Sequence, residues 1–94
     1  MAEKAYDNIE VLKFHATWCK PCKIYTRTFD IVTDRLGVAT RSIDIDLDTE
    51  AKEAYNITSI PTTVVLVNGI EKRRHVGTML NKDLTHMIQQ EADV

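Results

Sequence analysis

The sequence contains few cysteines, prolines and glycines, and it has no long apolar run. Of its 94 residues, two are cysteine, two are proline and three are glycine. No linker, repeat or low-complexity tract divides the chain, so we expect residues 1–94 to form a single domain with one modest core. No apolar stretch is long enough for a secretory signal or a membrane span, so we expect a cytoplasmic protein.

The sequence also lacks a large excess of either positive or negative charge. The net charge is −2, with 44% hydrophobic and 28% charged residues, as in an ordinary soluble globular protein. No basic patch rises above this background, and we therefore expect neither nucleic acid nor a membrane as a partner. We expect the chain to be a monomer.

The two cysteines, Cys19 and Cys22, lie together in the stretch "ATWCKPCK". Because structural disulfides are rare in the reducing cytosol, this spacing indicates a catalytic or a metal-binding pair. A structural zinc site takes about four ligands, and only histidines could complete this one. The three histidines are His15, His75 and His86, and none of them has zinc-finger spacing from the cysteines. This favours a redox pair over a metal site.

Hydrophobic periodicity predicts strands, by their alternation, and helices, by their three- and four-residue spacing. We expect strands over 9–14, 40–47, 62–67 and 70–76, with Ile43, Ile45 and Leu47 on one face of the second. A helix with the stripe Tyr25, Phe29, Val32 and Leu36 follows the cysteines, a short one covers about 49–56, and a third carries Leu80, Leu84, Met87 and Ile88.

Local signals fix the ends of these elements. Gly37 is a candidate C-cap, Asn68-Gly69 indicates a hairpin, and Thr78 or Asn81 is the candidate N-cap of the last helix. The charged run "EKRRH" is typical of an edge strand. The order β-α-β-α-β-β-α predicts an α/β fold in which a mixed four-stranded sheet is flanked by helices on both faces.

The cysteine pair is placed at a strand-to-helix junction. With Cys19 at the N-cap and Cys22 one turn later, side chains about 5–6 Å apart can form a disulfide. The open N–H groups and the helix dipole favour a thiolate at Cys19, and Lys20 and Lys23 add positive charge. Pro21 suits the first turn because its missing N–H leaves no helical bond unmade. We expect Cys19 to attack and Cys22 to resolve the mixed disulfide.

Three motifs together resemble the thioredoxin family: "WCKPC" at the junction, "SIPT" before the third strand and "NG" in the hairpin. The resemblance runs from about Ile9 to Ile88. It implies the thioredoxin fold and a protein-disulfide reductase that acts as a dithiol electron carrier, with a redox-active Cys19–Cys22 disulfide and no bound cofactor. It also implies a thioredoxin-reductase-type electron donor and client disulfide proteins, possible clients including ribonucleotide reductase.

The resemblance assigns further site residues. Pro61 is expected to be cis and to face the cysteines, although the sequence by itself would leave that bond trans. Ile60 is expected to offer backbone hydrogen bonds to a client peptide. Trp18 is interpreted as a flat contact surface, against the alternative of a core aromatic. Gly77 would complete the rim, against the alternative of a turn glycine.

The sequence departs from the family pattern six residues before Cys19. Thioredoxins usually have a buried aspartate there, thought to assist proton transfer, and this chain has Lys13. One interpretation is that Lys13 snorkels or pairs with Asp44 or Glu10. The other is that a partly buried Lys13 moves the proton or stabilises the thiolate, which would make a weaker reductant.

Smaller departures surround the same site. Ser42 replaces a lysine that the family often has on the neighbouring strand, and His15 stands where an aromatic is common. His15 either titrates near neutrality and affects the pair or is an ordinary strand-end histidine. Only 18 residues precede Cys19, so the 40–47 strand is expected at an exposed edge unless residues 1–7 cover it.

Two other functions remain open at the level of sequence. A glutaredoxin-like, glutathione-linked reductant would share the fold, but such proteins typically have Thr-Val-Pro and paired glycines, whereas this chain has Ser59-Ile60-Pro61 and no paired glycines. A redox-independent protein-binding module would use the same groove near Trp18. Substitution of both cysteines separates the module from the enzyme.

Overall fold

A computed structural model describes residues 6–92. The sheet has the strand order β2-β1-β3-β4. The strands are β1 (Ile9–His15), β2 (Ala39–Asp44), β3 (Thr62–Val67) and β4 (Ile70–Val76). β1 pairs in parallel with β2 and antiparallel with β3, and β3 pairs antiparallel with β4. The predicted mixed four-stranded sheet is confirmed.

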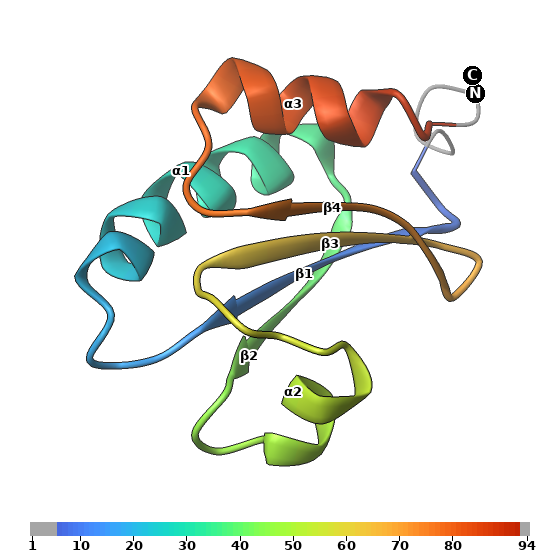
Figure 1. The fold of residues 1–94 in the computed structure, drawn as a ribbon. Helices are drawn as coiled ribbons and strands as arrows, with labels where there is room; N and C mark the ends of the chain where they lie inside the picture. The colour runs from blue at the N-terminus through green and yellow to red at the C-terminus, as the bar shows by residue number, and fades with distance from the viewer. Residues whose placement is uncertain (1–5, 93–94) are drawn as a thin grey trace.

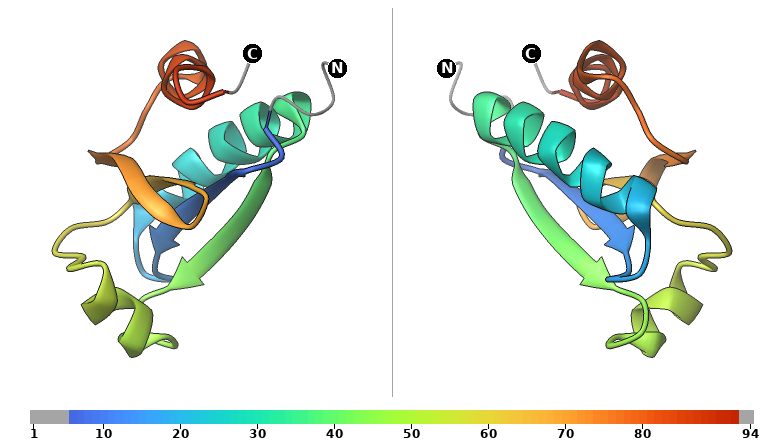
Figure 2. Two further views of the ribbon diagram at one scale, coloured as in Figure 1. Left: turned by 90° about the vertical axis from the view of Figure 1, so that its right-hand side faces the viewer. Right: turned by 90° about the vertical axis from the view of Figure 1, so that its left-hand side faces the viewer.

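Helices cover both faces of this sheet. The helices are α1 (Lys20–Leu36), α2 (Thr49–Ala54) and α3 (Asn81–Gln89). α1 and α3 pack against each other on one face, and α2 lies on the other, as Figures 1 and 2 show. The element order β-α-β-α-β-β-α is therefore confirmed as well.

The central strands are buried on both sides because each sheet face carries its own apolar cluster. On β1, Val11 belongs to the cluster under α1 and α3, and Leu12 to the cluster on the α2 side. Most of the predicted α1 stripe is buried in the first cluster: Tyr25, Phe29 and Val32. Both cysteines belong to the second cluster. The cysteine junction thus packs into the cluster on the α2 side, just after the end of β1.

Glycine and asparagine end two elements as the sequence predicts. Gly37 has a φ of 70° in the left-handed region, and its N–H bonds back to the carbonyls of Thr33 and Asp34. Asn68 and Gly69 have φ values of 53° and 79°, as a two-residue hairpin turn requires. These positions fix where α1 stops and where β3 reverses into β4.

Two boundary predictions are wrong. The second strand does not reach residue 47, because Leu47 and Asp48 donate their N–H groups to the Asp44 carbonyl in a turn. Leu47 is 86% exposed instead of facing the core. The N-cap of α3 is Leu80, which makes no side-chain cap bond, and neither Thr78 nor Asn81 has that position. Leu80 is exposed and does not join the α3 stripe.

β2 and β4 are the outer strands of the sheet within residues 6–92. The alternative that residues 1–7 cover β2 depends mainly on residues 1–5, which lie outside the described residues. In that described part of the chain, no helix is long and apolar enough to cross a membrane.

Candidate active site

The cysteines occupy the junction between β1 and α1. Cys19 is the N-cap of α1, with φ −87° and ψ 104°, and its Sγ accepts a hydrogen bond of 3.2 Å from the N–H of Cys22. A disulfide joins the two residues, whose Cα atoms are 5.2 Å apart. Pro21 lies in the first turn, where its missing N–H costs no helical bond. The predicted placement at the helix N-terminus is confirmed.

Exposure differs between the two sulfur-bearing residues. Cys19 is 5% exposed and Cys22 is 1% exposed. Cys22 is one turn inside α1 and packs among apolar side chains of the sheet, whereas Cys19 is at the open end of the helix. An incoming sulfur can therefore approach Cys19 more readily than Cys22.

A cis peptide bond joins Ile60 to Pro61, as the resemblance implies. The Pro61 carbonyl accepts a 2.7 Å hydrogen bond from the N–H of Gly77. Gly77 has a φ of 102°, a conformation that favours glycine, and so it can follow β4 in this tight contact. Gly77 is thus fixed against the cis-proline segment.

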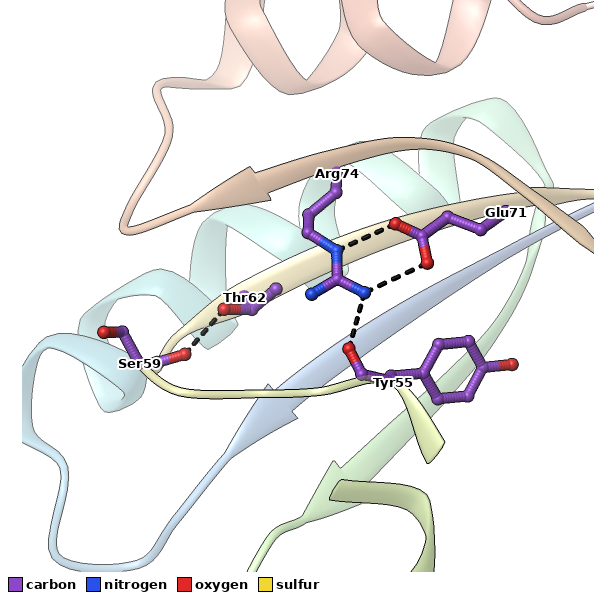
Figure 3. A network of polar contacts seen from close by, with 5 residues as sticks. All are labelled: Tyr55, Ser59, Thr62, Glu71 and Arg74. Carbon is purple, nitrogen blue, oxygen red and sulfur yellow. Dashed lines mark hydrogen bonds and ion pairs between the residues drawn. The ribbon is translucent and has the colours of Figure 1, made fainter. Parts of the chain in front are cut away.

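The loop that leads to Pro61 is anchored at both ends (Figure 3). The Arg74 guanidinium on β4 donates to the carbonyl of Tyr55 at 2.6 Å and to both carboxylate oxygens of Glu71. At the other end, Thr62 Oγ1 donates to the Ser59 carbonyl at 2.6 Å. These contacts hold the chain between α2 and β3 against the sheet.

Trp18 lies on the surface and is not a core aromatic. Its side chain is 66% exposed, and its Nε1 donates to Asp46 Oδ2 at 2.8 Å. The indole borders a groove of about 430 Å³. The groove has apolar, polar and charged walls: Trp18, Ile45, Asp46, Lys52, Ile57, Thr58, Ser59 and Ile60. Trp18 and Ile60 are therefore brought together beside Cys19.

Lys13 is buried between β1 and α1, with 3% of its surface exposed. Its Nζ donates to Thr26 Oγ1 at 2.7 Å and lies 5.2 Å from the centre of the Phe29 ring. Thr26 Oγ1 in turn donates to the Cys22 carbonyl at 2.9 Å. Burial lowers the pKa of Lys13, and the charge of Asp30 opposes this shift. A buried amine is thereby linked to the second cysteine.

The expected pairing of Lys13 with Glu10 or Asp44 is wrong. Glu10 points to the other face of β1 and pairs with Arg41 at 3.0 Å. Asp44 Oδ1 accepts the N–H of Asp46. Within residues 6–92 no carboxylate lies within 4.0 Å of the Lys13 amine, and the side chain does not snorkel to solvent.

His15 is the half-buried last residue of β1. Burial lowers its pKa, the charge of Lys13 lowers it further, and Asp44 opposes both. An effect of His15 on the cysteine pair stays a prediction. In the described part of the chain, no group of three or more histidine, cysteine, aspartate or glutamate side chains is placed to hold a metal ion.

Two contacts of the site could not be found from the sequence. Thr26 lies one turn after Cys22, but its role as the acceptor for Lys13 depends on how α1 packs on β1. Asp46 lies 28 residues from Trp18, and only the turn after β2 brings its carboxylate to the indole. In both cases the only local signal is a polar residue on an otherwise ordinary element.

A disulfide at a helix N-terminus, together with a cis-proline directly before a strand of a mixed sheet, defines the protein as a thiol–disulfide oxidoreductase. Comparison with known proteins narrows this class. The thioredoxin family profile matches residues 3–90, so the chain belongs to the thioredoxin family.

Individual relatives agree with this assignment. The chain is 41% identical to a thioredoxin of Mycoplasma genitalium over 70 residues, which cover 73% of this chain and 69% of the relative. It is 34% identical to a thioredoxin of Mycoplasma pneumoniae over 87 residues, covering 92% and 85% of the two chains. A mutant thioredoxin from Halobacterium salinarum superposes with a TM-score of 0.87 at 22% identity, covering 99% and 83%, and supports the fold.

Proposed function

We propose that this protein reduces disulfides of client proteins by cycling Cys19 and Cys22 between dithiol and disulfide. The observation that carries the proposal is the N-cap position of Cys19, the more exposed of the two cysteines. The helix N-terminus favours a thiolate there, and the thiolate is the form that attacks a disulfide.

The reaction proceeds in two exchanges. The Cys19 thiolate attacks one sulfur of the client disulfide, the client S–S bond breaks, and its electron pair leaves on the second client sulfur, which takes up a proton. The Cys22 thiolate then attacks Cys19, which releases the first client sulfur as a thiol. Two electrons have moved to the client, and the Cys19–Cys22 disulfide has formed. Pro21 keeps the first turn in a helical conformation throughout.

The client would lie across the surface formed by Trp18, Ile60, Pro61 and Gly77. Trp18 supplies an exposed flat ring, and the groove beside it can accept a side chain of the client. Ile60 makes no backbone hydrogen bond within the described residues 6–92, so its peptide groups are free to bind an extended client strand.

The cycle requires a source of electrons. A separate reductase of the thioredoxin-reductase type would return two electrons to the disulfide. Ribonucleotide reductase is one candidate client, to which the protein would pass these electrons. The protein would act in electron transport as a monomer and without a bound cofactor. A cytoplasmic location fits this direction, since a reducing compartment keeps the pair supplied with electrons.

Insulin reduction tests the proposal. With a recycling reductase or dithiothreitol as donor, the wild type should accelerate precipitation of the insulin B chain, and Cys19→Ser should fall to the uncatalysed rate. Cys22→Ser should lose turnover because it cannot resolve the mixed disulfide. Turnover by Cys22→Ser at the wild-type rate would show that Cys22 does not resolve it. Retained client binding in the double serine variant, without reduction by the wild type, would favour a binding module instead.

A further inference from the structure

The buried amine of Lys13 takes no part in the two exchange steps. It points from β1 into the interface with α1, where it contacts Thr26 and Phe29. Thr26 lies one turn after Cys22 and Phe29 lies about two turns after it, so the amine lies under the second and third turns of α1, the helix that holds the disulfide at its start. The contact with Thr26 fixes the position of the amine relative to that helix.

Within residues 6–92, no carboxylate lies within 4.0 Å of the positive charge of Lys13. The Thr26 hydroxyl already donates to the Cys22 carbonyl, so it accepts from Lys13 and supports the protonated amine. The face of the Phe29 ring also favours a cation. A buried cation without a carboxylate partner interacts favourably with any anion that forms nearby.

The other ionisable groups around Lys13 do not neutralise it at contact distance. Asp30 on α1 is exposed, and its charge only partly offsets the effect of burial. His15 lies on β1, and Asp44 on β2 acts on that histidine. Towards β3, the Tyr25 hydroxyl is hydrogen-bonded to Thr63 at 2.6 Å. Because none of these groups neutralises the amine at contact distance, a negative charge formed on the nearby cysteine pair would interact with it favourably.

Reduction creates such a charge. When a small dithiol reduces the Cys19–Cys22 bond, the dithiol becomes a disulfide, and two electrons and up to two protons pass to the pair. If one thiol then ionises, the pair carries one negative charge, whereas the disulfide is neutral. A cation buried against the same helix, one turn after Cys22, stabilises the thiolate form and leaves the energy of the disulfide almost unchanged.

We propose that Lys13, held by Thr26 one turn after Cys22, is a positioning residue that stabilises the reduced form of the Cys19–Cys22 pair. The proposal rests on the dithiol–disulfide cycle proposed above. Its consequence is that this protein is a weaker reductant than a variant with a neutral residue at position 13, because stabilising the reduced form makes a dithiol pair more oxidising.

The test is the equilibrium of the pair with reduced and oxidised dithiothreitol at neutral pH, measured by thiol alkylation and mass spectrometry. Lys13→Met keeps the length of the side chain and removes its charge. We expect its equilibrium to move about tenfold towards the disulfide, which corresponds to about 30 mV. The pKa of the Cys19 thiol, measured from the pH dependence of alkylation, should rise in the same variant.

Thr26 provides a second pair of variants. Thr26→Val removes the acceptor and leaves the amine without a hydrogen bond, which favours its neutral form, so its equilibrium should move in the same direction as that of Lys13→Met. Thr26→Ser keeps the hydroxyl and should match the wild type. This pair keeps the test decisive if Lys13→Met does not fold.

An equilibrium of Lys13→Met within twofold of the wild type, with an unchanged thiol pKa, would overturn the proposal. So would equal behaviour of Thr26→Val and Thr26→Ser. A purely structural role of Lys13 would change the free energy of unfolding without moving the thiol pKa. The equilibrium with dithiothreitol uses no protein client. If the wild type failed to reduce insulin but Lys13→Met still shifted this equilibrium, the result would count against the proposed function and not against this inference.

Discussion

The two sides of the disulfide have opposite polarity. On the outer side, large apolar side chains are exposed around the first turn of α1: Trp18, Ile24 and Leu80, at 66%, 75% and 65%. On the inner side, polar groups are buried between β1, α1 and β3: Lys13, Tyr25 and Thr63. Folded proteins usually show the reverse distribution. The exposed apolar side chains lie on the side of the proposed client surface, and the buried polar groups lie on the side of the role proposed for Lys13.

The outer side extends beyond the proposed client groove. A second groove of about 690 Å³ lies beside the first turn of α1, between that helix and the connection from β4 to α3. Its walls include Pro21 and the exposed Ile24 and Leu80. Exposed apolar surface of this kind typically marks contact with another molecule. The inner side is closed to solvent, since Lys13, Tyr25 and Thr63 are 3% exposed or less.

The largest effect is expected from opening the inner side. Phe29 is 1% exposed, packs edge-to-face against Tyr25 and covers the Lys13 amine. Phe29→Ala should lower the free energy of unfolding by about 3–5 kcal/mol because it leaves a cavity in the core. Urea denaturation measures this loss. A loss below about 1 kcal/mol would mean that the inner side is not closely packed.

Alkaline pH should also destabilise the inner side. Burial raises the pKa of Tyr25 to about 12 from its ordinary value of 10, and the hydrogen bond to Thr63 acts against this shift. A raised folded-state pKa contributes stability that is present below pH 10 and is lost as pH rises towards 12, up to roughly 2.7 kcal/mol.

The pH dependence is isolated by comparison with Tyr25→Phe. The lowered pKa of Lys13 has the opposite effect, because it makes stability rise with pH in the alkaline range. This effect is present in both the wild type and Tyr25→Phe, so it cancels in the comparison. The difference in unfolding free energy between wild type and Tyr25→Phe should therefore shrink above pH 10. Tyr55→Phe, at the half-buried ring beside Phe14, serves as the control. A pH-independent difference for Tyr25→Phe contradicts the account.

On the outer side, Trp18 should affect binding more than stability. Trp18→Ala removes an exposed ring from the proposed client surface, and we expect the KM for insulin to rise about tenfold, or about 1.4 kcal/mol, with little change in kcat. Trp18→Phe keeps a flat ring and should fall between the two. Steady-state kinetics measure the KM for insulin of each variant. An unchanged KM for Trp18→Ala would mean that Trp18 does not contact the client.

The smallest effect is expected at Ile24. Because its side chain is 75% exposed, Ile24→Ser should change the unfolding free energy by no more than about 0.5 kcal/mol. Val32→Ser on the same helix, at a fully buried position, should cost several times more. Equal losses in thermal or urea unfolding would show that the outer side is packed like the inner one.

Local signals made most of the fold predictable. Gly37 and the Asn68-Gly69 turn fix the ends of elements through backbone conformations that few other residues adopt. The N-cap position of Cys19 follows from the same kind of local reasoning. The predictions for Leu47 and Leu80 are wrong because the apolar periodicity continues beyond the ends of β2 and α3. Leu47 lies in a turn after β2, and Leu80 is the N-cap before α3.

The inner side was less predictable because its contacts join distant parts of the chain. Lys13 could be singled out by its position, but its partner depends on the packing of α1 against β1, 13 residues away. The hydrogen bond between Tyr25 and Thr63 spans 38 residues. Side-chain spacing along one element carries no information about such pairs.

The claim that Cys19 is the attacking sulfur is tested most directly by trapping the mixed disulfide. Reduced Cys22→Ser is mixed with an excess of insulin, the reaction is quenched with acid, and the adduct is mapped by mass spectrometry. The account predicts a covalent adduct of one insulin chain on Cys19, and little adduct when Cys19→Ser is treated in the same way. An adduct formed chiefly through Cys22 in Cys19→Ser, with none on Cys19, would contradict it.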